Sequence, residues 1–87
     1  MPILKPGVIQ ALTFFGQAME EKLEEHADKG ELWKEQPLSW LLDRLLEEVE
    51  ELKVALIDCT PQNAMRECAD VANFAMMIHD NLIRKMR

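Results

Sequence analysis

The sequence predicts an all-α domain made of three helices. Apolar residues recur every three or four positions in three long segments, which is the period of a helix with one buried face. Signals for strands are weak, because the chain has no Tyr, only three Gly and few runs of β-branched residues. A length of 87 residues fits one domain, residues 1–87.

The first helix is expected to begin near Pro6, because proline suits the first position of a helix. Gly30 is a plausible residue to stop it, since glycine commonly follows the last turn of a helix. Residues 31–36 then form a connector. The apolar row of this helix consists of Val8, Leu12, Phe15, Met19 and Leu23.

The second helix has the most regular pattern of the three, and Pro37 helps to open it. Its apolar residues alternate in steps of four and three, which is the pattern of a helix packed in a bundle. They are Leu38, Leu42, Leu45, Val49, Leu52 and Leu56.

The third helix follows a turn at residues 58–60. Thr60 is a good N-cap residue and Pro61 a good first residue, and we expect the helix to run to near the C-terminus. Its predicted apolar row is Met65, Cys68, Ala72, Ala75, His79 and Leu82.

Composition predicts association with further copies of the chain. Hydrophobic residues make up 48% of the chain, whereas a chain this short buries only about 60–65% of its unfolded surface. The excess apolar surface predicts an obligate homo-oligomer. The net charge of −6, from 16 acidic and 10 basic residues, argues against a nucleic-acid-binding protein, which needs a basic face.

The sequence also predicts a cytoplasmic protein that does not enter a membrane. No run approaches the roughly 18 apolar residues of a membrane span, and the N-terminus has no secretory pattern. Cys59 and Cys68 would close only a very short loop as a disulfide, so we expect both to be reduced thiols.

Two carboxylate pairs on consecutive helices are the main functional signal. Glu48 and Glu51 form the first pair, and Glu67 and Asp70 form the second. Residues three apart on a helix lie on the same side, about 5–6 Å apart at Cβ. Two such pairs facing each other would offer four oxygen ligands, which suits Mg²⁺ and substrates that carry phosphate. The sequence therefore predicts a magnesium-dependent enzyme that acts on a phosphorylated small molecule.

The surroundings of these carboxylates favour a buried site. Glu48 lies on the shoulder of the leucine row, and the row of Glu67 and Asp70 continues into Phe74 and Met77. Buried carboxylates need a compensating cation or hydrogen bonds, because an isolated buried charge is costly. The alternative is an ordinary solvated surface, since glutamate is a strong helix former and either pair alone is unremarkable.

At these residues the chain resembles the MazG-like superfamily of all-α nucleoside triphosphate pyrophosphohydrolases. The family signature is E-E-x-x-E on one helix and E-x-x-D on the next, which correspond here to residues 47–51 and 67–70. The resemblance covers residues 38–83, about half of the chain. It implies a minimal three-helix MazG-like module that dimerises into a four-helix-bundle-type core, as a homodimer or homotetramer.

The resemblance also implies an activity and roles for residues. The activity is hydrolysis of a nucleoside or deoxynucleoside triphosphate to the monophosphate and pyrophosphate. Glu47 would be the general base, a further ligand or an outer-sphere group, and Asn73 matches a position that faces the nucleotide in some relatives. Mg²⁺, or Mn²⁺ in its place, would be held by Glu48, Glu51, Glu67 and Asp70.

Three further side chains are candidates for contacts with a nucleotide. Trp33 lies in the connector, where it would stack on a base or else pack the end of the bundle. Lys53 is a candidate for a phosphate contact, as are Arg66 and Arg84, although all three also fit ordinary surface charges.

The leading functional hypothesis is a Mg²⁺-dependent nucleotide pyrophosphohydrolase. Within that class the substrate remains open and includes phosphoribosyl-ATP or a non-canonical deoxynucleotide. The alternative from another class is a non-enzymatic helical oligomerisation or partner-binding protein that keeps the fold. A third possibility is a plain acidic helical oligomer whose carboxylates are only surface groups.

Overall fold

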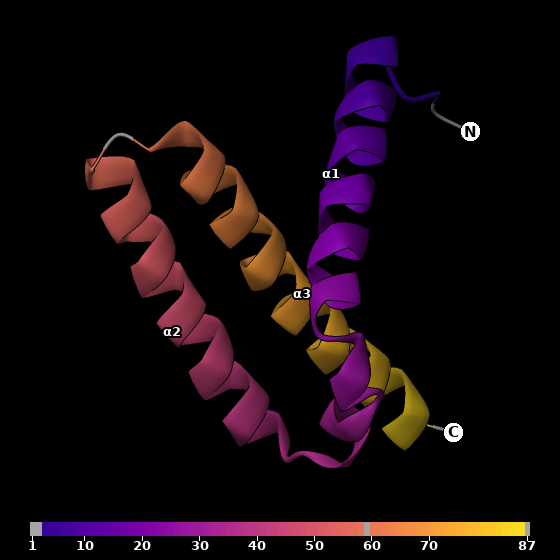
Figure 1. Ribbon diagram of the computed structural model, residues 1–87. Coiled ribbons are helices and arrows are strands. Elements are labelled where there is room, and N and C mark those ends of the chain that lie inside the picture. Colours follow the sequence, from indigo (N-terminus) through magenta and orange to yellow (C-terminus); the bar gives the residue numbers. More distant parts are fainter. Residues whose placement is uncertain (1–2, 59, 87) are drawn as a thin grey trace.

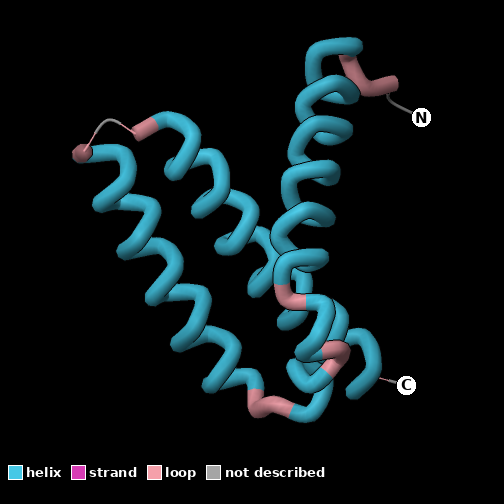
Figure 2. The backbone as a smooth tube through the Cα atoms, viewed as in Figure 1, coloured by secondary structure: helices cyan, strands magenta, loops and turns pink. Residues whose placement is uncertain are grey.

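The protein is all-helical in the computed structural model, which describes residues 3–58 and 60–86. The helices are α1 (Pro6–Glu25), α2 (Leu38–Ile57) and α3 (Pro61–Lys85), with two short 3-10 helices between α1 and α2, η1 (Ala27–Lys29) and η2 (Leu32–Glu35). Within the described ranges there is no strand (Figure 2). The predicted all-α fold with three long helices is confirmed.

The helices α2 and α3 form an antiparallel hairpin, and α1 packs against α3 (Figure 1). The C-terminal part of α1 crosses the middle of α3, whereas its N-terminal half stands apart from the hairpin. The segment with η1 and η2 then returns along the end of α3 to begin α2. This arrangement leaves much of α1 without a neighbour in the same chain.

Most predicted helix boundaries are observed. Pro6 and Pro61 are the first residues of α1 and α3. The first helix ends at Glu25, earlier than Gly30 had suggested, because the 3-10 turn η1 fills the interval. Gly30 follows that turn with φ 58°, a left-handed value that glycine adopts at little cost.

Thr60 occupies the N-cap position of α3, but its side chain does not cap the helix. Its Oγ1 instead donates a hydrogen bond to the carbonyl oxygen of Ala55 at 3.2 Å. The hydroxyl therefore satisfies a backbone carbonyl near the end of α2 and not a backbone N–H at the start of α3.

The buried core is small and consists mainly of alanines. Its fully or nearly fully buried apolar residues are Leu41, Ala55, Ala64 and Ala69. On α2 the buried row runs through Leu41, Glu48 and Ala55, seven residues apart, so the predicted leucine row lies at its edge. Leu42 and Leu56, for example, are 48% and 62% exposed.

The apolar row predicted for α3 is not the row that packs against the other helices of the chain, so this prediction is wrong. Met65 is 61% exposed, and His79 and Leu82 are also exposed. The buried positions are instead Ala64, Ala69, Asn73 and Asn81. Small residues allow close approach of helix backbones, which the periodicity of apolar residues does not reveal.

None of the helices in the described residues has the length and apolar character that crossing a membrane requires. Cys68 is a free thiol, and Cys59 lies outside the described residues.

Candidate metal centre

The carboxylates of α2 and α3 meet in one cluster. One oxygen each of Glu48, Glu67 and Asp70 lie within 4.8 Å of one another. Glu51 is more exposed but lies close enough that its carboxylate raises the pKa of both Glu48 and Glu67. The hairpin therefore brings together the two pairs that the sequence singled out, and we call these four residues the carboxylate cluster.

The most buried member of the cluster has an oxygen without a hydrogen-bond partner. Glu48 is only 7% exposed, and its Oε2 is buried and unpaired. Oε2 of Glu67 is also buried without a partner. Buried polar atoms are nearly always paired in folded proteins, because leaving them unpaired costs free energy. Two such oxygens beside Asp70 make a donor set that fits a cation that prefers oxygen ligands.

Burial and the crowding of like charges raise the pKa of two carboxyl groups in the cluster. Desolvation by burial, aided by the nearby carboxylates of Glu51 and Asp70, raises the pKa of Glu48 to about 8. Burial also raises the pKa of Glu67, with further contributions from the negative charges of Glu51 and Asp70, although the nearby Glu48 acts in the opposite direction.

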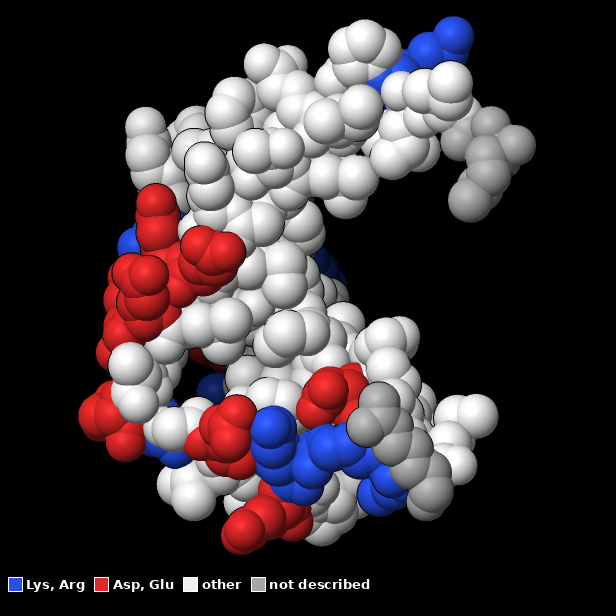
Figure 3. All heavy atoms as spheres, turned by 90° about the vertical axis from the view of Figure 1, so that its right-hand side faces the viewer, with Lys and Arg blue, Asp and Glu red and all other residues white. Residues whose placement is uncertain are grey.

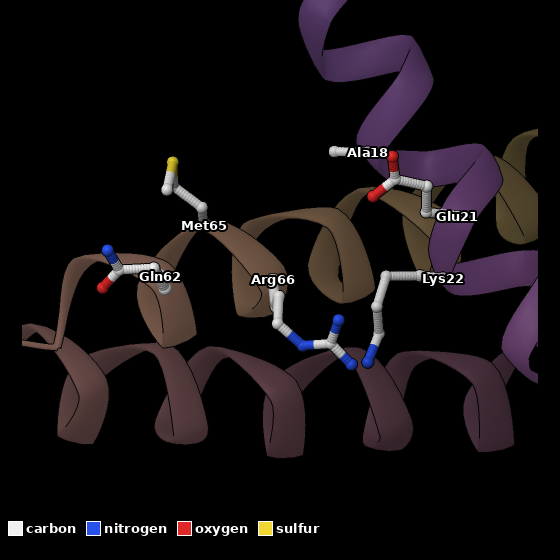
Figure 4. Close-up of a pocket in the computed structure, with 6 residues that line it drawn as sticks. All are labelled: Ala18, Glu21, Lys22, Gln62, Met65 and Arg66. Atoms are coloured by element: carbon white, nitrogen blue, oxygen red, sulfur yellow. The ribbon is translucent and has the colours of Figure 1, made fainter.

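A lysine from α1 reaches the cluster. Nζ of Lys22 lies 3.3 Å from Oδ2 of Asp70 and 3.1 Å from Oε2 of Glu25. Arg66 of α3 donates a hydrogen bond to the other oxygen of Glu25 at 2.7 Å. Figure 4 shows the side chains of Lys22 and Arg66 extending toward one another from α1 and α3. These ion pairs fasten the C-terminal end of α1 to α3.

An arginine of α2 also borders the cluster. Nη2 of Arg44 lies 3.4 Å from Oε1 of Glu48, and Nη1 pairs with Glu47. Its guanidinium carbon lies 5.3 Å from the centre of the Phe74 ring, a cation–π distance. Glu47, the candidate base, has a side chain that is 59% exposed. It therefore stands at the solvent-facing rim, joined to Glu48 through Arg44.

A cleft of about 190 Å³ opens beside the cluster, between the end of α1 and the hairpin. Asn73 contributes to its wall, is 4% exposed, and donates a hydrogen bond from Nδ2 to the carbonyl oxygen of Met19 at 3.1 Å. The residues that line this cleft are Lys22, Leu23, His26, Lys29, Arg44, Glu48, Asp70, Asn73, Phe74 and Met77.

The other candidates for nucleotide contacts lie outside this cleft. Trp33 accepts a hydrogen bond at its carbonyl oxygen from Asn81 at 3.2 Å, and Arg84 lies over its ring at 5.8 Å. It thus packs against the C-terminal part of α3. Lys53 is 64% exposed, and its Nζ lies 3.7 Å from Glu50.

Sequence reasoning missed Lys22 and Arg44 as neighbours of the cluster. A local signal existed for Arg44, which precedes Glu47 by three residues and Glu48 by four, the spacing of helical ion pairs. Lys22 stands three residues after Met19 and one before Leu23, in the apolar row of α1. A lysine in such a row signals a buried counter-charge, but not which carboxylate it meets.

Comparison with known proteins gave no match of this chain to a protein-family model, a curated protein or a solved structure. The chemistry of the site therefore rests on the residues and geometry described above.

Proposed function

We propose that this protein is a Mg²⁺-dependent nucleotide pyrophosphohydrolase that cleaves a nucleoside or deoxynucleoside triphosphate to the monophosphate and pyrophosphate. The observation that carries the proposal is the pair of buried, unpaired oxygens of Glu48 and Glu67 beside Asp70. Hard oxygen donors of this kind suit Mg²⁺, which often bridges protein carboxylates to phosphates. The choice of a nucleotide rests on the resemblance of the two motifs to the MazG-like signature.

In this proposal Glu48, Glu51, Glu67 and Asp70 hold the metal. When bound, Mg²⁺ neutralises phosphate charge and lowers the pKa of a coordinated water. Glu47 accepts a proton from the attacking water at the exposed rim, and Arg44 keeps its carboxylate in place. The water oxygen bonds to the α-phosphorus, and pyrophosphate leaves. Asn73, on the wall of the cleft, offers its unpaired Oδ1 as a hydrogen-bond acceptor for the nucleotide.

We further propose that the working form is a homodimer or homotetramer. The accessible surface is 6750 Å², whereas a folded monomer of 10.1 kDa is expected to expose roughly 5,300 Å². The surface over the N-terminal part of α1 is largely uncharged (Figure 3). Large apolar side chains exposed there are Val8, Ile9, Leu12, Phe14 and Phe15. A second copy that covers this face would complete the four-helix-type core that the resemblance implies.

The same apolar face favours a second candidate function, a non-enzymatic protein that only assembles or binds a partner. Oligomer state does not separate the two candidates, because both require association. Metal binding and turnover separate them.

The test is release of pyrophosphate from a panel of nucleoside and deoxynucleoside triphosphates with Mg²⁺. The variant Glu51→Gln removes one proposed ligand and should lower the rate by about 100-fold or more, since the metal supplies several kcal/mol of stabilisation. Glu50→Gln is the matched control, because Glu50 is the adjacent residue and pairs with the exposed Lys53. Absence of release by the wild type with every nucleotide would favour the non-enzymatic candidate.

A further inference from the structure

We propose that Lys22 is the counter-cation of the carboxylate cluster in the free protein and that it exchanges Asp70 for the substrate when a metal ion and a nucleotide bind. In the free protein its ammonium neutralises Asp70. A divalent cation displaces it from Asp70, and it then binds the phosphate chain of the nucleotide. This inference rests on the proposed function and assigns Lys22 a role in it that the sequence motifs do not contain.

The first step of the argument is the depth at which Lys22 lies. Its side chain is 13% exposed, although lysine ammonium groups normally remain in water. Its Nζ lies 3.3 Å from Asp70 and 3.1 Å from Glu25, so the ammonium bridges the cluster and a carboxylate outside it. The Lys22–Asp70 contact thus places a cation against the carboxylate of Asp70, one of the three residues that bring a carboxylate oxygen within 4.8 Å of the others.

The second step is that this cation is replaceable. A metal ion that uses Asp70 as a ligand would stand a few ångströms from the Lys22 ammonium, and like charges at that distance repel. Lysine has a flexible four-carbon stem, so its head group can move while the stem stays packed. Glu25, which Arg66 holds from α3, offers Lys22 a second partner after it leaves Asp70.

The third step concerns the chemistry of the space that Lys22 borders. Lys22, Lys29 and Arg44 all line the cleft of about 190 Å³ beside Glu48 and Asp70. Cationic side chains next to a candidate metal site are suited to phosphate oxygens, since charge-assisted hydrogen bonds to phosphate are among the strongest in proteins. An ammonium released from Asp70 remains at the wall of this cleft, where phosphates of a metal-bound nucleotide would meet it.

The experiment compares two affinities in the same variants: Mn²⁺ alone, and imidodiphosphate in saturating Mn²⁺, both by isothermal titration calorimetry. Lys22→Met keeps the aliphatic stem and removes the charge. It should bind Mn²⁺ about fivefold more tightly, because a competing cation is gone. It should bind imidodiphosphate about tenfold more weakly, because a phosphate contact is gone. Lys22→Arg should restore both affinities toward those of the wild type.

Lys34→Met is the matched control, since Lys34 forms another helical i,i+3 pair, with Glu31 at 2.9 Å, outside the cleft. It should change neither affinity. Lys22→Gln repeats the test with a polar side chain should Lys22→Met fail to fold. A simple structural ion pair would not give affinity changes of opposite sign.

The outcomes separate this inference from the proposed function. Equal or weaker Mn²⁺ binding by Lys22→Met, or unchanged imidodiphosphate binding, overturns the role of Lys22 and leaves the metal site standing. Binding of Mn²⁺ by Lys22→Met but not by the wild type would show that a metal ion does not displace Lys22 from Asp70, and it overturns both this inference and the proposed function. Failure of both proteins to bind Mn²⁺ overturns both.

Discussion

The side-chain amide of Asn73 joins α3 to α1 by donating a hydrogen bond to the carbonyl oxygen of Met19 at 3.1 Å. Asn73 is 4% exposed, and it lies one turn after Asp70 on the same helix. The contact holds the end of α1 beside the carboxylate cluster, where Lys22 can reach Asp70. The position of α1 and the composition of the site are therefore linked through one buried amide.

The first prediction concerns this amide. Asn73→Ala removes the hydrogen bond that joins α3 to α1 and should lower the free energy of unfolding by about 0.5–1.5 kcal/mol, the usual net contribution of an intramolecular hydrogen bond. Urea unfolding followed by circular dichroism measures the change. Asn63→Ala, at an exposed position of the same helix, is the control and should change stability by less than about 0.5 kcal/mol. Equal effects of the two substitutions would contradict the assigned role.

The second prediction concerns pH. The pKa of Glu48 rises from an ordinary 4.5 in the unfolded chain to about 8 in the folded protein. Between these values the folded state binds more protons than the unfolded state, so stability falls as pH rises. The metal-free protein should thus be less stable at pH 8 than at pH 5, by an amount on the order of a few kcal/mol.

Glu48→Gln tests the cause of that pH dependence. A neutral amide of nearly the same shape removes the titrating group, so the variant should be more stable than the wild type at pH 8 and show a flatter profile. Urea unfolding at pH 5, 6.5 and 8 in the presence of a chelator measures both profiles. A wild-type stability that rises over this range would contradict the burial assigned to Glu48.

The third prediction is stabilisation by metal. Mg²⁺ or Mn²⁺ that binds only the folded state raises the melting temperature with concentration. Because Glu48 must lose its proton to act as a ligand, the shift should be larger at pH 8.5 than at pH 6.5. Differential scanning fluorimetry gives the shift, and Asp70→Asn should abolish most of it. Asp80→Asn serves as the control, since Asp80 lies on the same helix and pairs with Arg84 at 3.0 Å.

The fourth prediction concerns assembly. Phe14 is 61% exposed on the uncharged face of α1. Phe14→Asp should convert the proposed oligomer to a monomer, because a charge in an apolar interface must be desolvated without a partner. Light scattering coupled to size-exclusion chromatography measures the mass. Ser39→Asp adds the same charge at an exposed position of α2 and should leave the mass unchanged.

The sequence was sufficient for features that depend on neighbours along the chain. Pro6 and Pro61 predicted where α1 and α3 begin. The spacing of Glu48 and Glu51 predicted that they lie on the same side of a helix. Features that depend on how helices meet were not predictable in this way. Met65 belongs to an apolar row yet is 61% exposed, because periodicity identifies an apolar face without identifying what covers it.

In the candidate site, too, some features depend on local spacing and others on how the helices meet. Its carboxylates came from local spacing, whereas the contact of Lys22 with Asp70 joins residues far apart in sequence. That contact depends on where α1 crosses α3, which no local pattern specifies. Trp33 illustrates the converse case, since its place in the connector left open both stacking and packing, and the structure shows its ring beside Arg84 at the end of α3.

The buried alanines lie close in sequence to the carboxylates of the proposed metal site. Ala69 is fully buried between Glu67 and Asp70 in the sequence, and Ala55 and Ala64 are buried on α2 and α3. Such small side chains set how closely the backbones approach, and those backbones carry the carboxylates. Mg²⁺ requires oxygens at about 2.0–2.1 Å, whereas Ca²⁺ requires about 2.3–2.6 Å. For the proposed metal site, we therefore expect the methyl groups of these alanines, which are not ligands, to influence the discrimination between small and large cations.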